Sequence, residues 1–415
     1  MIKNEMRSPA LSEQIEETVE WLASFGKTDN NGVTRPLYTD DWLFAQKAVE
    51  QRMNEIGLNA YFDDVGNLFG RLEGTLKEEG VILTGSHIDT VVNGGKYDGA
   101  YGVVAGLIAL QYLKEEYGYP KKNIEVVSLC EEEGSRFPMT YWGSGSIVGI
   151  KSVEDIQNLK DSKGTPFFEA MKQAGFGQGK YRNSKRNDLN CFIELHVEQG
   201  QVLELEGKSI GLVSHIVGQK RFTITVTGES NHAGTTPMNY RKDAMHAATE
   251  MIYSLLQKAK ETSPDLVCTV GQITLDPNIP NVIPGKATFS IDTRHPDEEV
   301  LASFCDEVFK EFTTITNSYK TQLHIDNWMN EKPVKMSEQL NKVTESILTK
   351  EKFSFKKMTS GAGHDSQILG QYCPTSLLFV PSHKGMSHSP FEYTSTEDLE
   401  KGIHLLIKVL HELAY

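Results

Sequence analysis

Apolar positions recur at helical spacing near both ends of the chain. Between Ser12 and Phe25, and again from Trp42 to Ile56, apolar residues lie three or four positions apart. This spacing predicts two amphipathic helices, because such residues share one helix face. A third stripe over Leu399–Leu413 follows Ser395 and Asp398, which have the spacing of a capping box. We therefore expect a helix to close the chain.

Short apolar runs between the first helices and about residue 200 have a different pattern. They cover 80–85, 123–129 and 191–196, and helical stretches over 103–117 and 167–174 separate them. Strands that alternate with helices are typical of an α/β sheet covered by helices on both faces. We expect such a sheet to form the larger part of the protein.

From about residue 214 the pattern changes to alternating apolar and polar positions. Strands are predicted over 221–227, 267–275, 286–292 and 321–328, with helices over 243–260 and 297–313. This order predicts a compact α+β unit, and helix and strand patterns of the first kind resume after it. We therefore expect an inserted domain at 214–328 within a catalytic domain formed by 1–213 and 329–415.

Length and charge narrow the class of protein. A chain of 415 residues exceeds the size of one ordinary core, which agrees with two domains. The net charge of −14 repels phosphate backbones and anionic membranes, so nucleic acid and membrane partners are not expected. Five widely spaced cysteines and a first segment without an apolar leader pattern favour a cytoplasmic protein without a disulfide framework.

Candidate metal ligands follow several of the predicted strands. His87 ends the strand at 80–85, and Asp89 lies two residues on, where it could accept the second ring N–H of that histidine. Asp98 stands before a glycine and a helix, and a carboxylate can bridge two cations. Alone, each motif is more often a capped turn or an Asp-Gly turn. Their common position at strand ends favours a site.

Three consecutive acids, Glu131 to Glu133, follow the strongly apolar strand at 123–129. Carboxylates packed there repel one another unless a cation neutralises them, and neighbours can divide coordination and proton transfer between them. His196 and His388 follow two further apolar runs. A mixed set of histidines and carboxylates without cysteine suits zinc, manganese or cobalt at a catalytic site.

Six blocks of sequence carry a resemblance to a known family. The chain resembles the M20 metallopeptidase superfamily, in its carbamoyl-amidohydrolase branch, over nearly its whole length and in the family's order of blocks. These blocks are Gly85-Ser-His-Ile-Asp-Thr, Gly95-Lys-Tyr-Asp-Gly, Glu131-Glu-Glu-Gly-Ser-Arg-Phe, His196-Val-Glu-Gln-Gly, His232-Ala-Gly-Thr-Thr-Pro-Met and Ser360-Gly-Ala-Gly-His-Asp.

The resemblance implies a dinuclear-metal hydrolase domain with a mixed sheet and an inserted ferredoxin-like lid and dimerisation domain. It implies two divalent ions per subunit, Mn²⁺ or Zn²⁺, one held by His87, Asp98 and His196 and the other by Asp98, Glu133 and His388. Glu132 would be the general base. Peptidase members commonly have a carboxylate where this chain has His196, which favours the carbamoyl-amidohydrolase branch.

The resemblance also implies a small-molecule ureido or carbamoyl substrate and a homodimer. His232, supplied by the partner subunit's lid, would stabilise the developing oxyanion, and Arg294 would bind a substrate carboxylate. Further substrate contacts are expected at Gln219, Asn281, Gly363 and His364. Allantoate is the expected substrate, an N-carbamoyl-L-amino acid is the alternative, and a non-catalytic metal-dependent binding protein is the alternative of another class.

Overall fold

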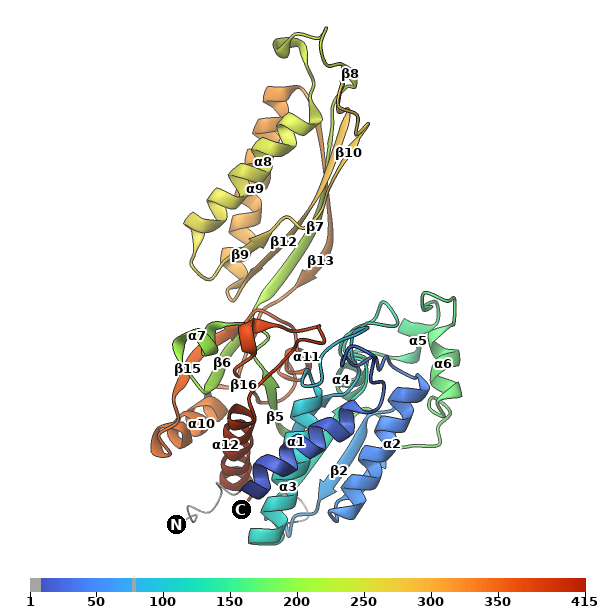
Figure 1. The fold of residues 1–415 in the computed structure, drawn as a ribbon, viewed down its shortest axis with the longest axis vertical. Helices are drawn as coiled ribbons and strands as arrows, with labels where there is room; N and C mark the ends of the chain where they lie inside the picture. The colour runs from blue at the N-terminus through green and yellow to red at the C-terminus, as the bar shows by residue number, and fades with distance from the viewer. Residues whose placement is uncertain (1–8, 77–79) are drawn as a thin grey trace. The chain divides into compact units, whose positions relative to one another are not determined.

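The computed structural model describes residues 9–76 and 80–415, so the expected absence of an N-terminal leader concerns residues outside the described ranges. The described chain forms two compact units (Figure 1). Unit 1 contains the residues up to Ser214 together with Lys335–Tyr415, and unit 2 is His215–Val334. Unit 2 ends at Val334 rather than at 328, because its last long strand continues to Glu331.

Unit 1 is built from helices and one mixed sheet. Its α-helices are α1 (Pro9–Ala23), α2 (Asp40–Glu55), α3 (Ala100–Tyr117), α4 (Trp142–Val148), α5 (Val153–Ile156), α6 (Phe167–Gln173), α7 (Val202–Glu206), α10 (Glu338–Lys350), α11 (Asp365–Leu369) and α12 (Thr396–Ala414), with the 3-10 turn η3 (His383–Gly385). Its strands are β1 (Asn59–Phe62), β2 (Leu68–Leu72), β3 (Val81–His87), β4 (Asn123–Leu129), β5 (Leu189–Val197), β6 (Ile210–Ile216), β14 (Val334–Lys335), β15 (Phe355–Ser360) and β16 (Thr375–Val380).

The sheet of unit 1 has the strand order β1-β2-β4-β3-β5-β16-β6-β14, and β15 pairs with β6. The four central strands β4, β3, β5 and β16 are parallel to one another, whereas β2 and β6 run antiparallel to their neighbours in this group. The carboxyl ends of the four parallel strands therefore lie along one edge, where ligands collect in open α/β sheets.

Both faces of the central sheet are covered. Every residue of β3, β4 and β16 is buried, as expected for parallel strands between two helical layers. Alternate side chains enter different cores: Ile82 and Val126 pack in the large cluster with α3 and α12, while Leu83 and Val127 pack in a smaller cluster on the other face. The predicted α/β architecture is confirmed.

Local signals define where two helices begin. The Thr39 side chain accepts a hydrogen bond from the Trp42 amide and caps α2, and Ser395 accepts one from the Asp398 amide at the start of α12. Ser395 is therefore the N-cap residue of α12; of the predicted capping box, the bond from the Asp398 amide to the Ser395 hydroxyl is present, and that hydroxyl donates to the Asp398 carboxylate at 2.6 Å. Within the described residues, no helix has the length and apolar character needed to cross a membrane.

Unit 2 is an antiparallel sheet covered on one face by two long helices (Figure 1). Its elements are β7 (Gly218–Thr227), β8 (Asn231–His232), η2 (Met238–Tyr240), α8 (Ala244–Thr262), β9 (Val267–Thr269), β10 (Ile273–Asp276), β11 (Val282–Ile283), β12 (Lys286–His295), α9 (Glu298–Tyr319) and β13 (Gln322–Glu331). The main strand order is β10-β12-β7-β13, with β9 beside β12, and β8 pairs separately with β11.

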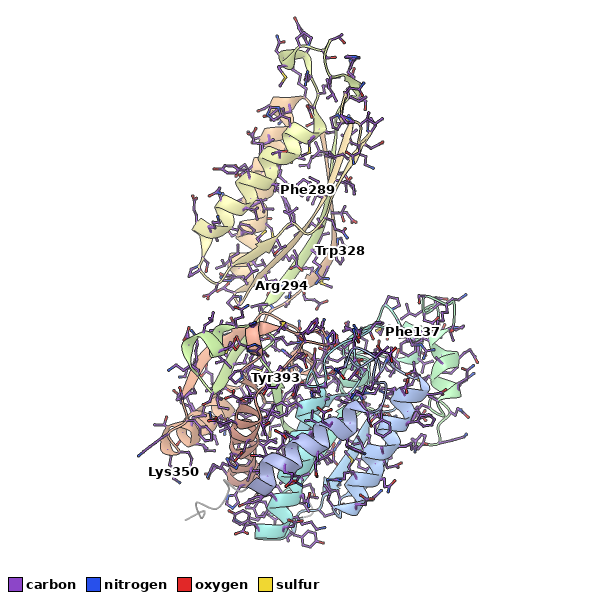
Figure 2. The ribbon with its side chains drawn as sticks, viewed as in Figure 1. Phe137, Phe289, Arg294, Trp328, Lys350 and Tyr393 are labelled. Atoms are coloured by element: carbon purple, nitrogen blue, oxygen red, sulfur yellow. The ribbon has the colours of Figure 1, made fainter. Side chains whose placement is uncertain are left out.

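Alternation along β7 and β12 gives the sheet of unit 2 two different faces. Phe222, Ile224 and Phe289 pack in a core with α8 and α9, and Phe289 is labelled in Figure 2. Residues one position away point to the opposite face, because side chains alternate along a strand. That face carries polar side chains, including Arg221 and Arg294.

Candidate metal centre

Five candidate ligands meet at the carboxyl edge of the parallel strands of unit 1. His87 is the last residue of β3, His196 is near the end of β5, and Glu133 follows β4. Asp98 lies in the loop before α3, and His388 lies in the loop after β16. The chain brings them together in two groups, His87 with Asp98 and His196, and Asp98 with Glu133 and His388, whose potential ligand atoms lie within 4.8 Å of one another.

Asp98 belongs to both groups. Its Oδ1 lies 3.2 Å from His196 Nε2 and 3.8 Å from His87 Nε2, while its Oδ2 lies 3.2 Å from His388 Nε2. Burial would raise the pKa of Asp98, but hydrogen bonds with His196 and His388 hold it well below its ordinary value. A buried, ionised carboxylate with a different imidazole beside each oxygen is the geometry that a bridging ligand requires.

Two histidines present the correct ring nitrogen to this carboxylate. His196 Nδ1 lies 2.8 Å from the Val197 carbonyl, and His87 Nδ1 lies 3.0 Å from the carbonyl of Asp89. A proton on each Nδ1 places the lone pair on Nε2, the ring nitrogen that faces Asp98, and in this structure His196 Nε2 also accepts the Gly99 amide N–H at 3.0 Å. The expected contact from His87 to the Asp89 carboxylate is replaced by this main-chain contact, since Asp89 Oδ1 is 3.7 Å away.

Asp89 supports the site in another way. Its Oδ2 accepts the amide N–H of Glu133 at 3.1 Å, which ties the loop after β3 to the loop after β4. Its Oδ1 is buried without a hydrogen-bond partner. Asp89 therefore contacts the main chain of one candidate ligand and lies beside another.

The three acids after β4 are crowded in a buried environment. Burial, followed by the charge of Asp98, raises the pKa of Glu133 to about 8. Burial and the charge of Glu133 raise the pKa of Glu132 well above its ordinary value. Glu131 is fully buried, and neither carboxylate oxygen has a hydrogen-bond partner. Such a concentration of carboxyl groups fits a site that is neutralised by cations.

Glu132 lies beside the ligand groups without belonging to either. Its Oε2 is 3.9 Å from His87 Nε2, and its side chain retains 12% exposure. A raised pKa and access to the edge of the site suit a group that accepts and donates a proton. The donor set of histidine and carboxylate atoms fits divalent cations, whose chemistry when bound is to polarise a carbonyl group and lower the pKa of water.

The two further residues predicted in unit 1 lie close to the ligands. The His364 ring packs edge-on against His196 with 4.6 Å between centroids, and its Nε2 is 3.2 Å from Ser360 Oγ. His364 is almost fully buried, so in this structure it supports a candidate ligand. A Cβ on Gly363 would lie 1.9 Å from the Tyr141 hydroxyl, so a side chain there would require the Tyr141 ring to move. Tyr141 had no distinguishing motif in the sequence.

The predicted residues of unit 2 form two groups. His232 is exposed, pairs with Val282 across β8 and β11, and accepts the Gly234 N–H at its Nδ1. Asn281 is its neighbour, since the Asn281 carbonyl accepts the amide of Ala233. These residues form a small exposed hairpin-like site that presents an imidazole.

Gln219 and Arg294 lie opposite each other on β7 and β12, where both contact Asp292. Arg294 donates from Nε and Nη2 to the two Asp292 oxygens at 2.9 Å, and Gln219 Nε2 donates to Oδ2 at 2.9 Å. Arg221 Nε also donates to Oδ2, at 2.8 Å. Neither Asp292 nor Arg221 was predicted, because their proximity depends on the register between strands. The Nε and Nη2 atoms of the Arg294 guanidinium are thus hydrogen-bonded to Asp292 within the protein.

The fold and the ligand groups define an α/β protein with a candidate divalent-metal centre of histidines and carboxylates. The family description "Peptidase family M20/M25/M40" matches residues 83–412, and the chain belongs to this family. The chain uses divalent metal, as the family and the candidate ligand groups support.

Similar proteins match over almost their whole length. The "Allantoate amidohydrolase" of Bacillus subtilis is 48% identical over 99% of this chain and 100% of its own length. The "N-carbamoyl-L-amino-acid amidohydrolase" of Paenarthrobacter aurescens is 35% identical over 97% of this chain and 98% of its own. A crystal structure of an amidase of the hydantoinase/carbamoylase family from Burkholderia multivorans has a TM-score of 0.93 at 32% identity, covering 98% of this chain and 99% of that one.

Proposed function

We propose that this protein is an allantoate amidohydrolase that hydrolyses a ureido C–N bond with two divalent cations. The observation that carries the hydrolytic chemistry is Asp98, shared between two ligand groups with Glu132 beside them. The substrate assignment is supported by 48% identity with a relative of that name, against 35% with one named for N-carbamoyl-L-amino acids. The expected products are ureidoglycine, ammonia and carbon dioxide.

Each residue has a task in this proposal. His87, Asp98 and His196 hold one cation, and Asp98, Glu133 and His388 hold the other. The cations, Mn²⁺ or Zn²⁺, supply Lewis acidity at the ureido carbonyl. Glu132 accepts a proton from the attacking water and delivers it to the leaving nitrogen, a role supported by its position beside His87 at the edge of the ligand groups.

Unit 2 supplies the substrate-binding side chains in this proposal. It acts as a lid and dimerisation domain, and the partner's copy of His232 donates a hydrogen bond to the developing oxyanion. Arg294, whose Nε and Nη2 are held by the Asp292 carboxylate, binds the substrate carboxylate in this proposal. Gln219, Asn281, Gly363 and His364 complete the pocket. A homodimer mass in light scattering is expected, and a strictly monomeric active enzyme would contradict the role of His232.

Ammonia release from allantoate tests the function directly. Metal-free protein is reconstituted separately with Mn²⁺ and Zn²⁺, and kcat/KM is measured for allantoate, N-carbamoylglycine and a hydrophobic N-carbamoyl amino acid. We expect metal-dependent turnover with allantoate preferred. Turnover of the carbamoyl amino acids without turnover of allantoate would replace the substrate assignment by the N-carbamoyl-L-amino-acid activity of the second relative. No turnover of any ureido compound would favour a binding protein.

A further inference from the structure

Glu392 is a buried carboxylate that lies against the loop carrying Asp98. Only 5% of the residue is exposed, although it follows the half-exposed candidate ligand His388 by four positions. Its Oε1 accepts the main-chain N–H of Tyr97 at 2.7 Å and that of Asp98 at 3.0 Å. One carboxylate oxygen therefore holds two consecutive amides of the loop between β3 and α3.

The loop is shaped to receive this carboxylate. A Cβ on Gly95 would lie 2.2 Å from Glu392 Cδ and within 2.4 Å of both its oxygens, so the glycine leaves the space that the carboxylate fills. Charge-assisted hydrogen bonds to main-chain amides are among the stronger hydrogen bonds in proteins. The main chain at Asp98 is thus fixed from the side of the C-terminal segment.

The Asp98 side chain is held by the same segment. Its Oδ2 accepts Ser387 Oγ at 3.1 Å and Gln199 Nε2 at 2.9 Å, in addition to facing His388. Ser387 Oγ also lies 3.4 Å from Glu392 Oε2. Residues 387–392 therefore supply one candidate ligand and contact both the main chain and the side chain of another.

We propose that Glu392 is a positioning residue that sets the distance between Asp98 and His388. Because Asp98 and His388 come from loops almost three hundred positions apart, their separation is not determined by any local element. The hydrogen bonds from the Tyr97 and Asp98 amides to Glu392 fix this separation, although Glu392 itself does not contact a cation. This inference rests on the metal centre of the proposed function, and it assigns a role to a residue outside both ligand groups.

Cation binding to metal-free protein tests this role. Isothermal titration with Mn²⁺ is compared for the wild type, Glu392→Ala, Glu392→Gln and Glu392→Asp. Loss of groups that orient ligands costs about 10–100-fold in metal affinity, and we expect a loss in this range for at least one Mn²⁺ binding event in Glu392→Ala. The glutamine variant keeps an oxygen that can accept both amides, so it should stay within about threefold of wild type.

Glu198 provides a matched control. It is 7% exposed, and its carboxylate accepts the main-chain N–H groups of Val202 at 2.8 Å and Leu203 at 3.0 Å, neither of which is a candidate ligand. Glu198→Ala should lower the melting temperature of metal-free protein about as much as Glu392→Ala while leaving Mn²⁺ affinity unchanged. The comparison separates loss of stability from loss of ligand positioning.

Each outcome decides the question. If Glu392→Ala binds Mn²⁺ with the same affinity as the Glu198→Ala control, the positioning role of Glu392 is overturned. If Glu392→Ala does not fold, Glu392→Asp, which keeps the charge but withdraws the acceptor by one methylene, is read in its place and should also weaken binding. Wild-type protein that binds no Mn²⁺ would reject the metal centre itself, which distinguishes failure of the proposed function from failure of this inference.

Discussion

Replacing Gly99 with alanine should remove His87 from the metal centre. Gly99 precedes α3 with φ +62°, and a Cβ built there would lie 2.4 Å from Nε2 and Cε1 of the His87 ring. Carbon atoms in contact are ordinarily about 3.5–4.0 Å apart, so the ring must retreat by about 1 Å. Metal–ligand distances tolerate only about 0.2 Å, and a displaced imidazole therefore ceases to coordinate.

Gly118 at the other end of α3 gives a matched control. Its φ is +76°, but a Cβ there would meet nothing within 4 Å. Both glycines have a positive φ that other residues rarely adopt, with ψ −50° at Gly99 and −144° at Gly118, and backbone strain of this kind costs of order 1–3 kcal/mol in each alanine variant. Each should therefore melt a few degrees below wild type as metal-free protein. Only Gly99→Ala adds the clash with a candidate ligand.

Metal content and affinity separate the two variants. The proteins are dialysed against Mn²⁺ and passed briefly over a gel-filtration column. Inductively coupled plasma mass spectrometry should then find fewer Mn²⁺ ions per subunit in Gly99→Ala than in wild type or Gly118→Ala. Titration of Gly99→Ala with Mn²⁺ should show that the affinity of one binding event is lower by about 10–100-fold. If Gly99→Ala retained the metal content and affinity of Gly118→Ala, the placement of His87 as a ligand would be wrong.

Three further predictions concern turnover, protons and substrate affinity. Glu132→Gln should lower kcat by about 10²–10⁴-fold with metal content unchanged, and a fully active variant would exclude Glu132 as the general base. The hydrogen bond to Asp98 raises the pKa of His388 to about 9 in metal-free protein, so the imidazole is protonated at pH 7 and must lose this proton to coordinate. Mn²⁺ binding in weak buffer at pH 7 should release protons, and affinity should rise between pH 7 and 9; binding without proton release contradicts this. Asp292→Asn removes the charge that orients Arg294, so KM for allantoate should rise roughly tenfold, for a hydrogen bond to a charged group of about 1.5 kcal/mol, with kcat little changed; an unchanged KM argues against that orientation.

Long apolar runs and clear helix stripes allowed much of the fold to be predicted. β3, β4 and β5 lie within or close to the expected runs, and α12 starts directly after the expected cap residue Ser395. The short strands β1 and β2 were not expected, since four or five residues give too little periodicity for a strand to be recognised. α10 and β15 were not predicted individually. They fall under the general expectation that helix and strand patterns of the catalytic domain resume after the inserted domain.

The sequence allowed the ligand positions to be proposed because His87, Glu133, His196 and His388 follow strands, and parallel strands bring their ends to one edge. Asp98, which precedes α3, was proposed from its place between glycines and from the family resemblance. Glu392 and Ser387 carried no such signal, and Gln199, although it follows β5, was not singled out. Their contacts with Asp98 depend on how distant loops fold over one another, and a lone glutamate between an aromatic pair reads as an ordinary surface residue. Asp292 could be connected with Arg221 only after the register of β7 and β12 was known.

The position at which unit 2 enters the chain has a consequence for how this architecture can diversify. The strands β6 and β14, which lead into and out of the insertion, are neighbours in the sheet, and the Met336 amide donates to the Ser214 carbonyl at 2.9 Å. The larger unit is therefore closed by its own hydrogen bonds where the insertion departs. Evolution can lengthen, remodel or exchange the inserted segment without altering the candidate cation ligands or Glu132, so substrate preference can change while this part of the hydrolytic machinery is inherited intact.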